Sequence, residues 1–379
     1  MAERVSNHRI ENAVLRAGMA AVRLIPGGRR PDRVERILVV RLGNLGDIIV
    51  TLPAFHALRK LYPKAHITLL TSPTRRGAPG AVEVLARDNT FDEMIVYYED
   101  ESRAPAFLRQ LRGRLTALQP GLAVVMASDK TRFDSLAKYL ILLPSCGIRR
   151  IVGLRRTPHA ESLGGHVPHF LRVVEQLGRV HVEPFPWIRV DEEDHAYARA
   201  LLNGRGPGPL IAMQCGAKRS TNRWMPARFA ELGRRLVADH GATLVLTGSP
   251  SERELTALVA DGVHGNCINV AGETDIPRLA ALTQACDLLV SNDTGTMHVA
   301  AAMGTPVVAL FSGRDYPGRW DPYGDAHEVI RKPVDCSPCL AENCPRFDEP
   351  ECMRLIEVRH VADAVARVLG RNGAAPSTV

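Results

Sequence analysis

Short apolar runs alternate with stretches of helical periodicity along most of the chain, and this alternation starts twice. The first start is an unbroken apolar run at 36–42, followed by a glycine turn and a helix expected at about 48–61. A strand is expected at 65–71, so strand, turn, helix and strand form a βαβ unit. Further strands are expected at 93–97 and 121–126.

The second start lies near 209–213, and the alternation then continues almost to the end of the chain. Strands are expected at 243–247, 267–270, 288–291 and 307–311. Helices are expected at 226–240, after Pro250, and at 276–285, 296–303 and 358–369. Prolines and glycines interrupt all periodicity between 183 and 209. We therefore expect an N-terminal extension at 1–34, a domain at 35–190, a second domain at 191–370 and a flexible tail at 371–379.

Unbroken apolar strands that alternate with helices indicate parallel sheets covered on both faces. The expected fold class is α/β, with two doubly wound domains and a cleft between them. Ligands of such sheets bind beyond the carboxyl ends of the strands. The loops to search are therefore those after Leu42, Met213, Thr247, Ser291 and Phe311.

The composition is that of a chain that buries a proper core. Of 379 residues, 45% are hydrophobic and 23% are charged, which excludes global disorder, collagen-like repeats and disulfide scaffolds. The net charge of +7 indicates an anionic partner. Seven arginines against three acidic residues place +4 of it in residues 1–34. Because the surplus lies in one terminal segment and aromatic residues make up 5%, nucleic-acid binding has little support.

The first segment has the pattern of a basic amphipathic helix, with Arg9, Arg16 and Arg23 recurring every seven residues. A neighbouring apolar stripe consists of Ile10, Val14, Ala17, Ala21 and Leu24. Such a helix either lies on an anionic membrane surface or packs on the body of the protein. The pattern does not fit a signal peptide, and no apolar run is long enough to span a membrane. We expect a cytoplasmic protein, with peripheral contact at the inner membrane as the alternative to a packed helix.

Four of the eight cysteines form a cluster with the spacing Cys336-x2-Cys339-x4-Cys344-x7-Cys352. In a cytoplasmic protein this pattern indicates either reduced thiols or a small structural metal loop rather than disulfides.

The first candidate site is Gly43-Asn44-Leu45-Gly46-Asp47, directly after the first expected strand. It lacks the G-x-G-x-x-G spacing of a dinucleotide site. Gly43 and Gly46 permit a tight turn, and Asp47 either caps the following helix or projects toward a ligand as a general base.

The second candidate site is the run from Ser291 to His298, which follows a strand and opens a helix. Exposed N–H groups at a helix start favour phosphate oxygens. Asp293 and Thr294 can cap the helix and bind sugar hydroxyls, and His298 either reaches a diphosphate or packs in the core.

The third candidate site is the loop 216–224, where Lys218, Arg219 and Arg223 place three cations within six residues. This density suits a pyrophosphate, and the alternative is a solvated basic loop.

These motifs, in this order, resemble the ADP-heptose:lipopolysaccharide heptosyltransferases, glycosyltransferase family 9. The similarity lies in 37–53 (Ile-Leu-Val-Val-Arg-Leu-Gly-Asn-Leu-Gly-Asp and the residues up to Pro53), in 291–311 and in the cysteine cluster ending at Cys352-Met353. It covers about 36–369 and leaves out the N-terminal extension.

The resemblance implies a GT-B fold, with two Rossmann-like domains facing across the active-site cleft. It also implies that Asp47 is the catalytic base, and that the second domain holds a nucleotide-sugar donor with no cofactor or metal. Asp293, Thr294, Gly295 and His298 then lie at the sugar and diphosphate, and Glu252 at the nucleoside. One position departs from the family, which usually carries a lysine where this chain has Asn222, so Lys218, Arg219 or Arg223 must meet the phosphate charge.

The expected activity is inverting transfer of heptose from ADP-heptose to a Kdo- or heptose-bearing lipid A. The expected acceptor is an anionic glycolipid, and first-domain basic residues are its candidate ligands: Arg75, Arg76, Arg149, Arg150, Arg155 and Arg156. Two alternatives remain open, a GT-B transferase that uses another nucleotide sugar and a non-catalytic sugar-nucleotide-binding module.

Overall fold

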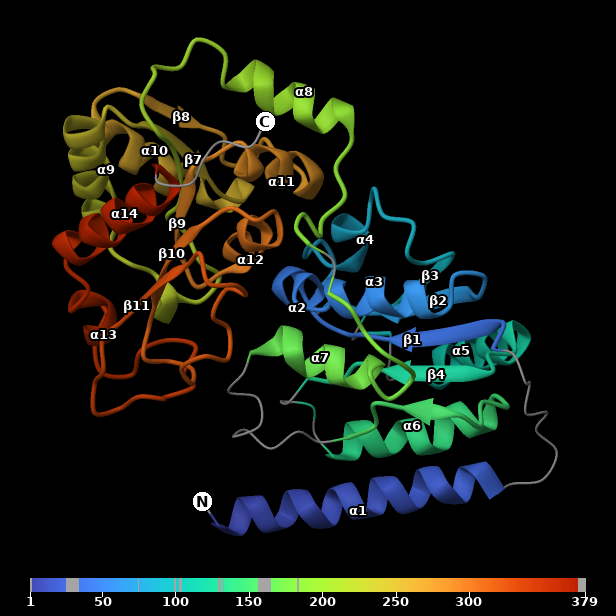
Figure 1. Cartoon of the computed structure of the whole chain (residues 1–379). Helices are drawn as coiled ribbons and strands as arrows, with labels where there is room; N and C mark the ends of the chain where they lie inside the picture. The colour runs from blue at the N-terminus through green and yellow to red at the C-terminus, as the bar shows by residue number, and fades with distance from the viewer. Residues whose placement is uncertain are drawn as a thin grey trace. The chain divides into compact units, whose positions relative to one another are not determined.

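The computed structural model describes residues 2–24, 34–73, 75–98, 100–101, 104–128, 131, 133–155, 165–182 and 184–373. The chain divides into two compact units, Met1–Pro184 and Phe185–Val379 (Figure 1). This division lies six residues before the expected start of the second domain at 191. Among the described residues, no helix is long and apolar enough to cross a membrane.

A five-stranded parallel sheet forms the centre of the first unit, in the order β3-β2-β1-β4-β5. Its strands are β1 (Arg36–Val40), β2 (His66–Thr71), β3 (Glu93–Val96), β4 (Leu122–Val125) and β5 (Ile151–Val152). In the register, Val40 lies beside Leu70 of β2 and Val125 of β4. Because β1 lies between β2 and β4, the strand order reverses between β1 and β4, where a doubly wound sheet binds its ligands.

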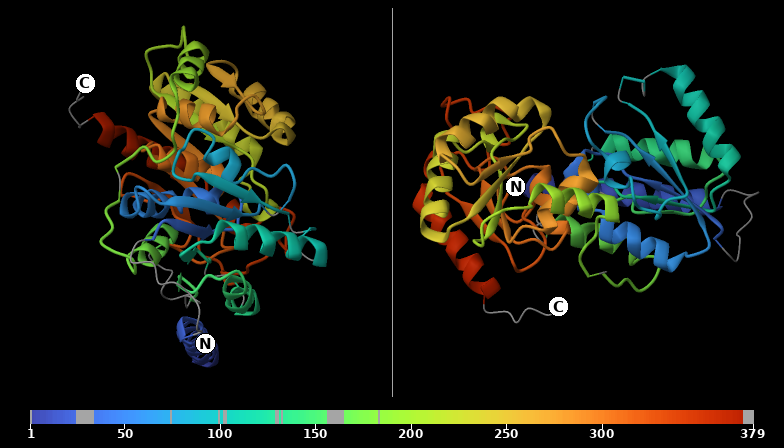
Figure 2. Two further views of the ribbon diagram at one scale, coloured as in Figure 1. Left: turned by 90° about the vertical axis from the view of Figure 1, so that its right-hand side faces the viewer. Right: turned by 90° about the horizontal axis from the view of Figure 1, so that it is seen from above.

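Apart from the N-terminal helix, which packs on another helix, the helices of the first unit cover both faces of this sheet (Figures 1 and 2). They are α1 (Ala2–Leu24), α2 (Leu45–Ile49), α3 (Leu52–Leu61), α4 (Ala81–Val84), α5 (Pro105–Leu118), α6 (Phe133–Ser145) and α7 (His166–Val174). One core joins alternate β1 residues, Leu38 and Val40, to α5 and α6. α3 packs against α7. The single helix expected at 48–61 is broken at Val50–Thr51, so that a separate short helix, α2, carries Asp47.

The N-terminal helix α1 packs against α6, but not through the expected apolar stripe. Leu15 and Val22 are buried, and a Cβ at Gly18 would lie 2.7 Å from Leu140 of α6. Ile10 and Val14 from the expected stripe remain 63% and 50% exposed. The helix therefore has two apolar faces, of which one packs on α6 and the other, the expected stripe, is exposed where the structure describes it.

The second unit contains a six-stranded parallel sheet in the order β11-β10-β9-β6-β7-β8. Its strands are β6 (Leu210–Gln214), β7 (Thr243–Thr247), β8 (Cys267–Asn269), β9 (Leu288–Asn292), β10 (Val307–Phe311) and β11 (Glu328–Arg331). Met213 of β6 lies beside Leu246 of β7 and Val290 of β9. The order reverses between β6 and β9, as it does between β1 and β4 in the first unit.

Helices also cover both faces of the second sheet. They are α8 (Glu192–Leu201), α9 (Pro226–His240), α10 (Arg253–Val263), α11 (Ile276–Gln284), α12 (Gly295–Ala302), α13 (Glu351–Arg354) and α14 (Val358–Gly373), with short turns η2 (Ser220–Asn222) and η3 (Pro250–Glu252). One core packs α9, α10 and α14 on the sheet, and another packs α8, α11 and α12. α14 continues to Gly373, so the first three residues of the expected tail are helical, and 374–379 lie outside the described residues.

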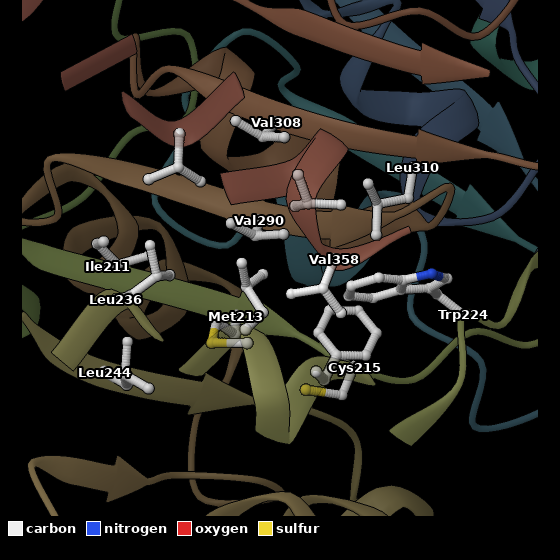
Figure 3. Close-up of a cluster of buried hydrophobic side chains, with 14 of the residues drawn as sticks. Ile211, Met213, Cys215, Trp224, Leu236, Leu244, Val290, Val308, Leu310 and Val358 are labelled. Carbon is white, nitrogen blue, oxygen red and sulfur yellow. The ribbon is translucent and has the colours of Figure 1, made fainter. Parts of the chain in front are cut away.

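Trp224 anchors the loop after β6 in the first of these cores (Figure 3). Its indole is fully buried, lies edge-on to Phe229 with 4.9 Å between ring centroids, and donates a 2.8 Å hydrogen bond from Nε1 to the Ile356 carbonyl. Because the indole ring is buried and its N–H has an acceptor, Trp224 fixes the end of the basic loop 216–224.

The two parallel sheets give an α/β molecule of two Rossmann-like units, which is the pair that makes up the GT-B fold.

Candidate active site

A cavity of about 400 Å³ opens in the first unit beside the carboxyl ends of β1 and β4. Its walls come from three segments, 40–43 with Asp47, 72–73, and 125–128 with Thr131, and from two tyrosines, Tyr97 and Tyr139. This is the edge where the strand order reverses, so the cavity lies where such sheets bind ligands.

Asp47 lies on the wall of this cavity, with 26% of its side chain exposed. It is the third residue of α2, and its Oδ2 accepts a 3.1 Å hydrogen bond from the Asn44 N–H. That bond is half of a capping box, which satisfies an N–H that the helix cannot. The two sequence interpretations of Asp47 are therefore compatible, since one carboxylate supports the helix start and faces the cavity.

The turn that aims Asp47 requires glycine at position 43. Gly43 has φ +146°, and a Cβ there would lie 2.4 Å from the Asp47 Cβ. Any side chain would therefore displace Asp47 itself. Gly46 is the second residue of α2, and its carbonyl accepts the Val50 N–H at 3.1 Å.

Two tyrosines give the cavity a neutral, hydroxyl-bearing wall. Burial raises the pKa of Tyr97 to about 12. Burial also raises the pKa of Tyr139, and Tyr97 adds to that rise. Both phenols therefore stay protonated and can donate hydrogen bonds to a sugar hydroxyl.

The arginines expected to hold an anionic acceptor do not line this cavity where the structure describes them. Arg76 pairs with Asp100 and Glu101 and stacks on Tyr98, 4.1 Å from the ring centroid. Arg75, Arg150 and Arg155 are exposed and Arg149 is partly buried. Arg156 lies outside the described residues.

In the second unit, two loops are joined where the strand order reverses between β6 and β9. Asn292, the last residue of β9, donates a 2.8 Å hydrogen bond to the Cys215 carbonyl. Its Oδ1 accepts a 3.1 Å bond from the Trp224 N–H. The side chain of Asn292 thus fixes the loop after β6 against the loop after β9.

Asp293 and Asn222 meet in this junction. The Asn222 Nδ2 donates to the Asp293 Oδ2 at 2.9 Å and to its carbonyl at 3.1 Å. The Asn222 Oδ1 accepts a 2.8 Å bond from the Ser312 hydroxyl. Both the Nδ2 and the Oδ1 of Asn222 are therefore hydrogen-bonded. Asn222 links Asp293 to Ser312 without a charge, at the position where the family usually has a cation.

Burial raises the pKa of Asp293 to about 6, and the neighbouring Asp315 carboxylate adds to the rise. Arg219, Arg314 and Arg331 oppose this shift through their positive charges. Asp293 therefore changes charge close to neutral pH, which is uncommon for a structural carboxylate.

Helix α12 starts directly after Asp293. Thr294 is its N-cap residue, although its side chain makes no capping hydrogen bond, and Gly295 is its first residue. Burial lowers the pKa of His298 to about 4, with His327 contributing, and its ring lies 5.9 Å from that of Trp320. His298 is therefore neutral at physiological pH and supplies no positive charge for a diphosphate.

Comparisons with known proteins identify the family of the chain. A family model described as glycosyltransferase family 9 (heptosyltransferase) matches residues 154–347. The chain belongs to glycosyltransferase family 9. It is therefore a glycosyltransferase of the heptosyltransferase family.

Individual relatives of this family 9 enzyme match either most of its chain or a part of it. The lipopolysaccharide core heptosyltransferase OpsX of Haemophilus influenzae is 22% identical over 306 residues, which are 78% of this chain and 84% of the relative. Lipopolysaccharide heptosyltransferase 2 of Escherichia coli is 34% identical over 152 residues, 39% of this chain and 43% of the relative. The solved structure of E. coli ADP-heptose lps heptosyltransferase II has a TM-score of 0.65 and 23% identity, with 89% of this chain and 100% of that chain covered.

The remaining basic-loop residues of the family 9 enzyme do not all converge on Asp293. Lys218 and Arg223 are exposed, and the Arg223 Nε donates to the Ala217 carbonyl at 2.8 Å. Arg219 lies 3.7 Å from Glu342 and is close enough to act on Asp293.

Glu252, after β7, lies beside the loop after β6. A Cβ at Gly216 would lie 1.8 Å from the Glu252 Oε1, and the Gln214 Nε2 lies 3.4 Å from Oε2. The Ser249 N–H and hydroxyl donate to Glu252 at 2.7 and 2.9 Å. Gly216 is therefore required for Glu252 to lie at the end of β6.

Sequence reasoning missed the charged residues after β10. Arg314 is buried, donates from Nε to the Ala341 carbonyl at 2.8 Å, and lies 3.4 Å from Asp315. Asp315 also pairs with Arg319 at 3.0 Å. The signal was present, since the loop after Phe311 was among those to search and its Ser-Gly-Arg-Asp run follows a strand end directly.

The four clustered cysteines line one small cavity with Arg314 and Arg346, and all four are free thiols. Within the described residues, no group of three or more His, Cys, Asp or Glu side chains is arranged to hold a metal ion. Burial raises the pKa of Cys352, which keeps that thiol protonated.

Proposed function

We propose that this family 9 enzyme transfers heptose from ADP-heptose to the inner core of lipopolysaccharide, on a lipid A that carries Kdo or heptose, with inversion at the anomeric carbon. One observation carries the proposal: the Asp47 carboxylate lies on the wall of a cavity of about 400 Å³ at the ligand-binding edge of the first sheet. The cavity accommodates a sugar ring, and the carboxylate within it is placed to take a proton.

In the proposed reaction, an acceptor hydroxyl in the cavity attacks the anomeric carbon of the donor. Asp47 accepts the proton of that hydroxyl as the new C–O bond forms. The bond between the anomeric carbon and the diphosphate oxygen breaks, and ADP leaves with the electron pair. Because attack and departure take place on opposite faces of the sugar, the anomeric configuration inverts.

The second unit is the proposed donor site. A neighbouring fold is that of a protein named ADP-heptose lps heptosyltransferase II, which supports ADP-heptose as the donor. Glu252 is proposed to hold the nucleoside, and Thr294 and Gly295 at the start of α12 to face the diphosphate. Asp293 is proposed at the sugar. Since His298 is neutral and Asn222 replaces the lysine of the family, arginines supply the positive charge, with Arg219 beside Asp293.

The test of the base uses Asp47→Asn with a matched control. Asparagine keeps an oxygen that can accept the Asn44 N–H but cannot take a proton, so we expect kcat to fall about 10²–10⁴-fold. Glu83→Gln is the control, because Glu83 accepts the Gly80 N–H at 2.7 Å in the same capping arrangement of α4 and does not line the cavity. Near-normal turnover of Asp47→Asn with ADP-heptose and a Kdo- or heptose-bearing lipid A would show that Asp47 is not the base.

The donor is tested separately, by thermal shift with ADP-heptose, UDP-sugars and GDP-sugars. Asn222 at the family's lysine position makes another nucleotide sugar the leading alternative. Stabilisation by a UDP- or GDP-sugar alone would replace ADP-heptose in the proposal. Stabilisation by ADP-heptose without any transfer product in mass spectrometry would favour a non-catalytic binding module.

Helix α1 supports a peripheral position at an anionic membrane. Its packed face uses Leu15 and Val22, which leaves Ile10 and Val14 exposed beside the exposed Arg16. Apolar side chains flanked by arginine are what an interfacial helix presents to anionic lipid. We expect flotation with phosphatidylglycerol vesicles and loss of flotation in an Ile10→Ser, Val14→Ser variant. Equal recovery of both proteins in the vesicle fraction would contradict this role.

A further inference from the structure

Arg41 is a buried cation placed directly between the first strand and the Asp47 turn. It follows Val40, the last residue of β1, and 2% of it is exposed. Its guanidinium lies over the Phe170 ring of α7, 4.3 Å from the centroid. A buried arginine is costly unless its donors are occupied, so its partners reveal what it is there to hold.

The partners of Arg41 are groups that carry or support Asp47. The Nη2 donates to the Asp47 carbonyl at 2.7 Å and lies 3.4 Å from the Asp47 Oδ1. The Nε donates to the Thr51 hydroxyl at 2.9 Å, and that hydroxyl in turn donates to the Asp47 carbonyl at 2.7 Å. Arg41 and Thr51 thus close a ring of hydrogen bonds around the main chain of Asp47.

The carboxylate itself is held from two sides. Arg41 lies at Oδ1, and the Asn44 N–H donates to Oδ2 at 3.1 Å. Each oxygen still has lone pairs directed elsewhere, because a carboxylate has about four acceptor sites. The carboxylate therefore has a fixed orientation and remains able to accept a proton from the cavity.

The other end of the guanidinium reaches across to the neighbouring strand. The Nη1 lies 3.4 Å from the Met126 carbonyl, directly after β4, and Met126 also lines the cavity. Next to it, the His169 Nε2 lies 3.0 Å from the Ala127 carbonyl. Arg41 therefore links the two strand ends between which the strand order reverses, with Asp47 on one side and the cavity wall on the other.

We propose that Arg41 is the positioning residue for Asp47, and that the Thr51 hydroxyl, which bonds both Arg41 and the Asp47 carbonyl, supports the same orientation. This inference rests on the proposed function, in which Asp47 is the base. In this role Arg41 acts through Asp47: it fixes the distance and angle between the Asp47 carboxylate and an acceptor hydroxyl in the cavity. Displacement of a catalytic group by about 1 Å costs on the order of 10²-fold in rate, which sets the size of the expected effect.

The experiment compares Arg41→Met, Arg41→Lys and Thr51→Val with Arg36→Met in the full-length enzyme. Arg36 begins the same strand, is exposed and donates from its Nη1 to the Leu118 carbonyl at 3.1 Å, away from Asp47, so it is the matched control. We expect kcat to fall about 10²-fold in Arg41→Met and about tenfold in Thr51→Val. Lysine should recover part of the loss, because one ammonium reaches one of the oxygens that the guanidinium holds.

The division between kcat and KM separates positioning from a merely structural role. The KM for the donor should stay within about threefold in all variants, because the proposed donor residues belong to the second unit. Thr51→Val keeps the buried charge, so it remains informative if Arg41→Met fails to fold. Equal kcat in Thr51→Val and Arg36→Met, or a loss in Arg41→Lys as deep as in Arg41→Met, would overturn the positioning role.

Failure of the proposed function has a different signature. If wild-type enzyme transfers no sugar from ADP-, UDP- or GDP-sugars, the proposed function fails and the positioning role falls with it. If wild type transfers sugar and Asp47→Asn abolishes transfer while Arg41→Met does not lower kcat, only the role of Arg41 is refuted.

Discussion

Replacing Asp293 by asparagine should stabilise the second unit at neutral and alkaline pH. Burial and Asp315 raise the pKa of Asp293 to about 6 from an ordinary value of 3.8. The ionised form is therefore tolerated less well in the folded protein than in the unfolded chain. Asparagine keeps an oxygen for the Asn222 Nδ2 and carries no charge, so it removes this cost.

The expected gain follows from the size of the pKa rise. About two pKa units correspond to about 3 kcal/mol of unfolding free energy, and the partial exposure of Asp293 reduces the figure to about 1–3 kcal/mol. The sign follows from proton binding. The folded wild type holds a proton that the unfolded chain has lost between about pH 4 and 6, so its stability falls across that window as pH rises. The variant should be equal to wild type near pH 4 and more stable by the full amount at pH 8.

Intrinsic fluorescence is the suitable assay, because all three tryptophans, Trp187, Trp224 and Trp320, belong to the second unit. Denaturant unfolding at pH 4, 6 and 8 gives the free energies, and a melting temperature higher by about 3–10 °C at pH 8 is expected. The titration of His298 occurs in both proteins and cancels in the difference. Asp261→Asn, an exposed substitution on α10, is the control and should change nothing. Equal or lower stability of Asp293→Asn at pH 8, or an advantage that persists at pH 4, would refute the reasoning.

Two further substitutions test the turn at Asp47 and the core beneath the basic loop. Gly43→Ala should lower kcat about 10–10²-fold, because its Cβ would lie 2.4 Å from that of Asp47. Gly77→Ala is the control in the same assay and should leave kcat unchanged, since Gly77 also has a positive φ but has open space around it. Trp224→Phe should lower the free energy of unfolding by about 1–3 kcal/mol, because the smaller ring leaves space at a fully buried position and the Ile356 carbonyl keeps only the 2.6 Å donation from the Arg228 Nη1. Denaturant unfolding followed through Trp187 and Trp320 measures this. A loss below about 0.5 kcal/mol would mean that the Arg228 donor alone satisfies the carbonyl and that the core closes around the smaller ring.

The sequence predicts both sheets because each of their central strands is an apolar run. The edge strands β5 and β11 escape this signal: Ile151–Val152 is only two residues long, and Glu328–Arg331 carries a charge at each end. Which face of α1 packs could not be predicted either, since the helix has two apolar stripes. The choice depends on Leu140 of α6, which is distant in sequence and fits the gap at Gly18.

For the site, local sequence identifies the residues next to strand ends but not their partners. Asp293 directly follows β9 and Asp47 lies just after the glycine turn that follows β1, so the sequence predicts both. Arg41 was overlooked, although a charge inside an apolar run signals a buried ion that needs partners. The bond between Asn222 and Asp293 joins residues 71 positions apart, and only the folded chain brings them together.

The segment between β11 and α13 supports two loops of the candidate donor site in the second unit. It contains no helix or strand, yet its carbonyl at Ala341 holds Arg314, and its Asn343 accepts the Ser220 hydroxyl at 2.7 Å. The loop after β10 and the basic loop after β6 thus rest on the same irregular stretch. A single proteolytic cut between Cys339 and Asn343 would remove one support from both loops at once while both cores stay folded. The arginine side chains of these loops would then lose their positions before the fold is lost.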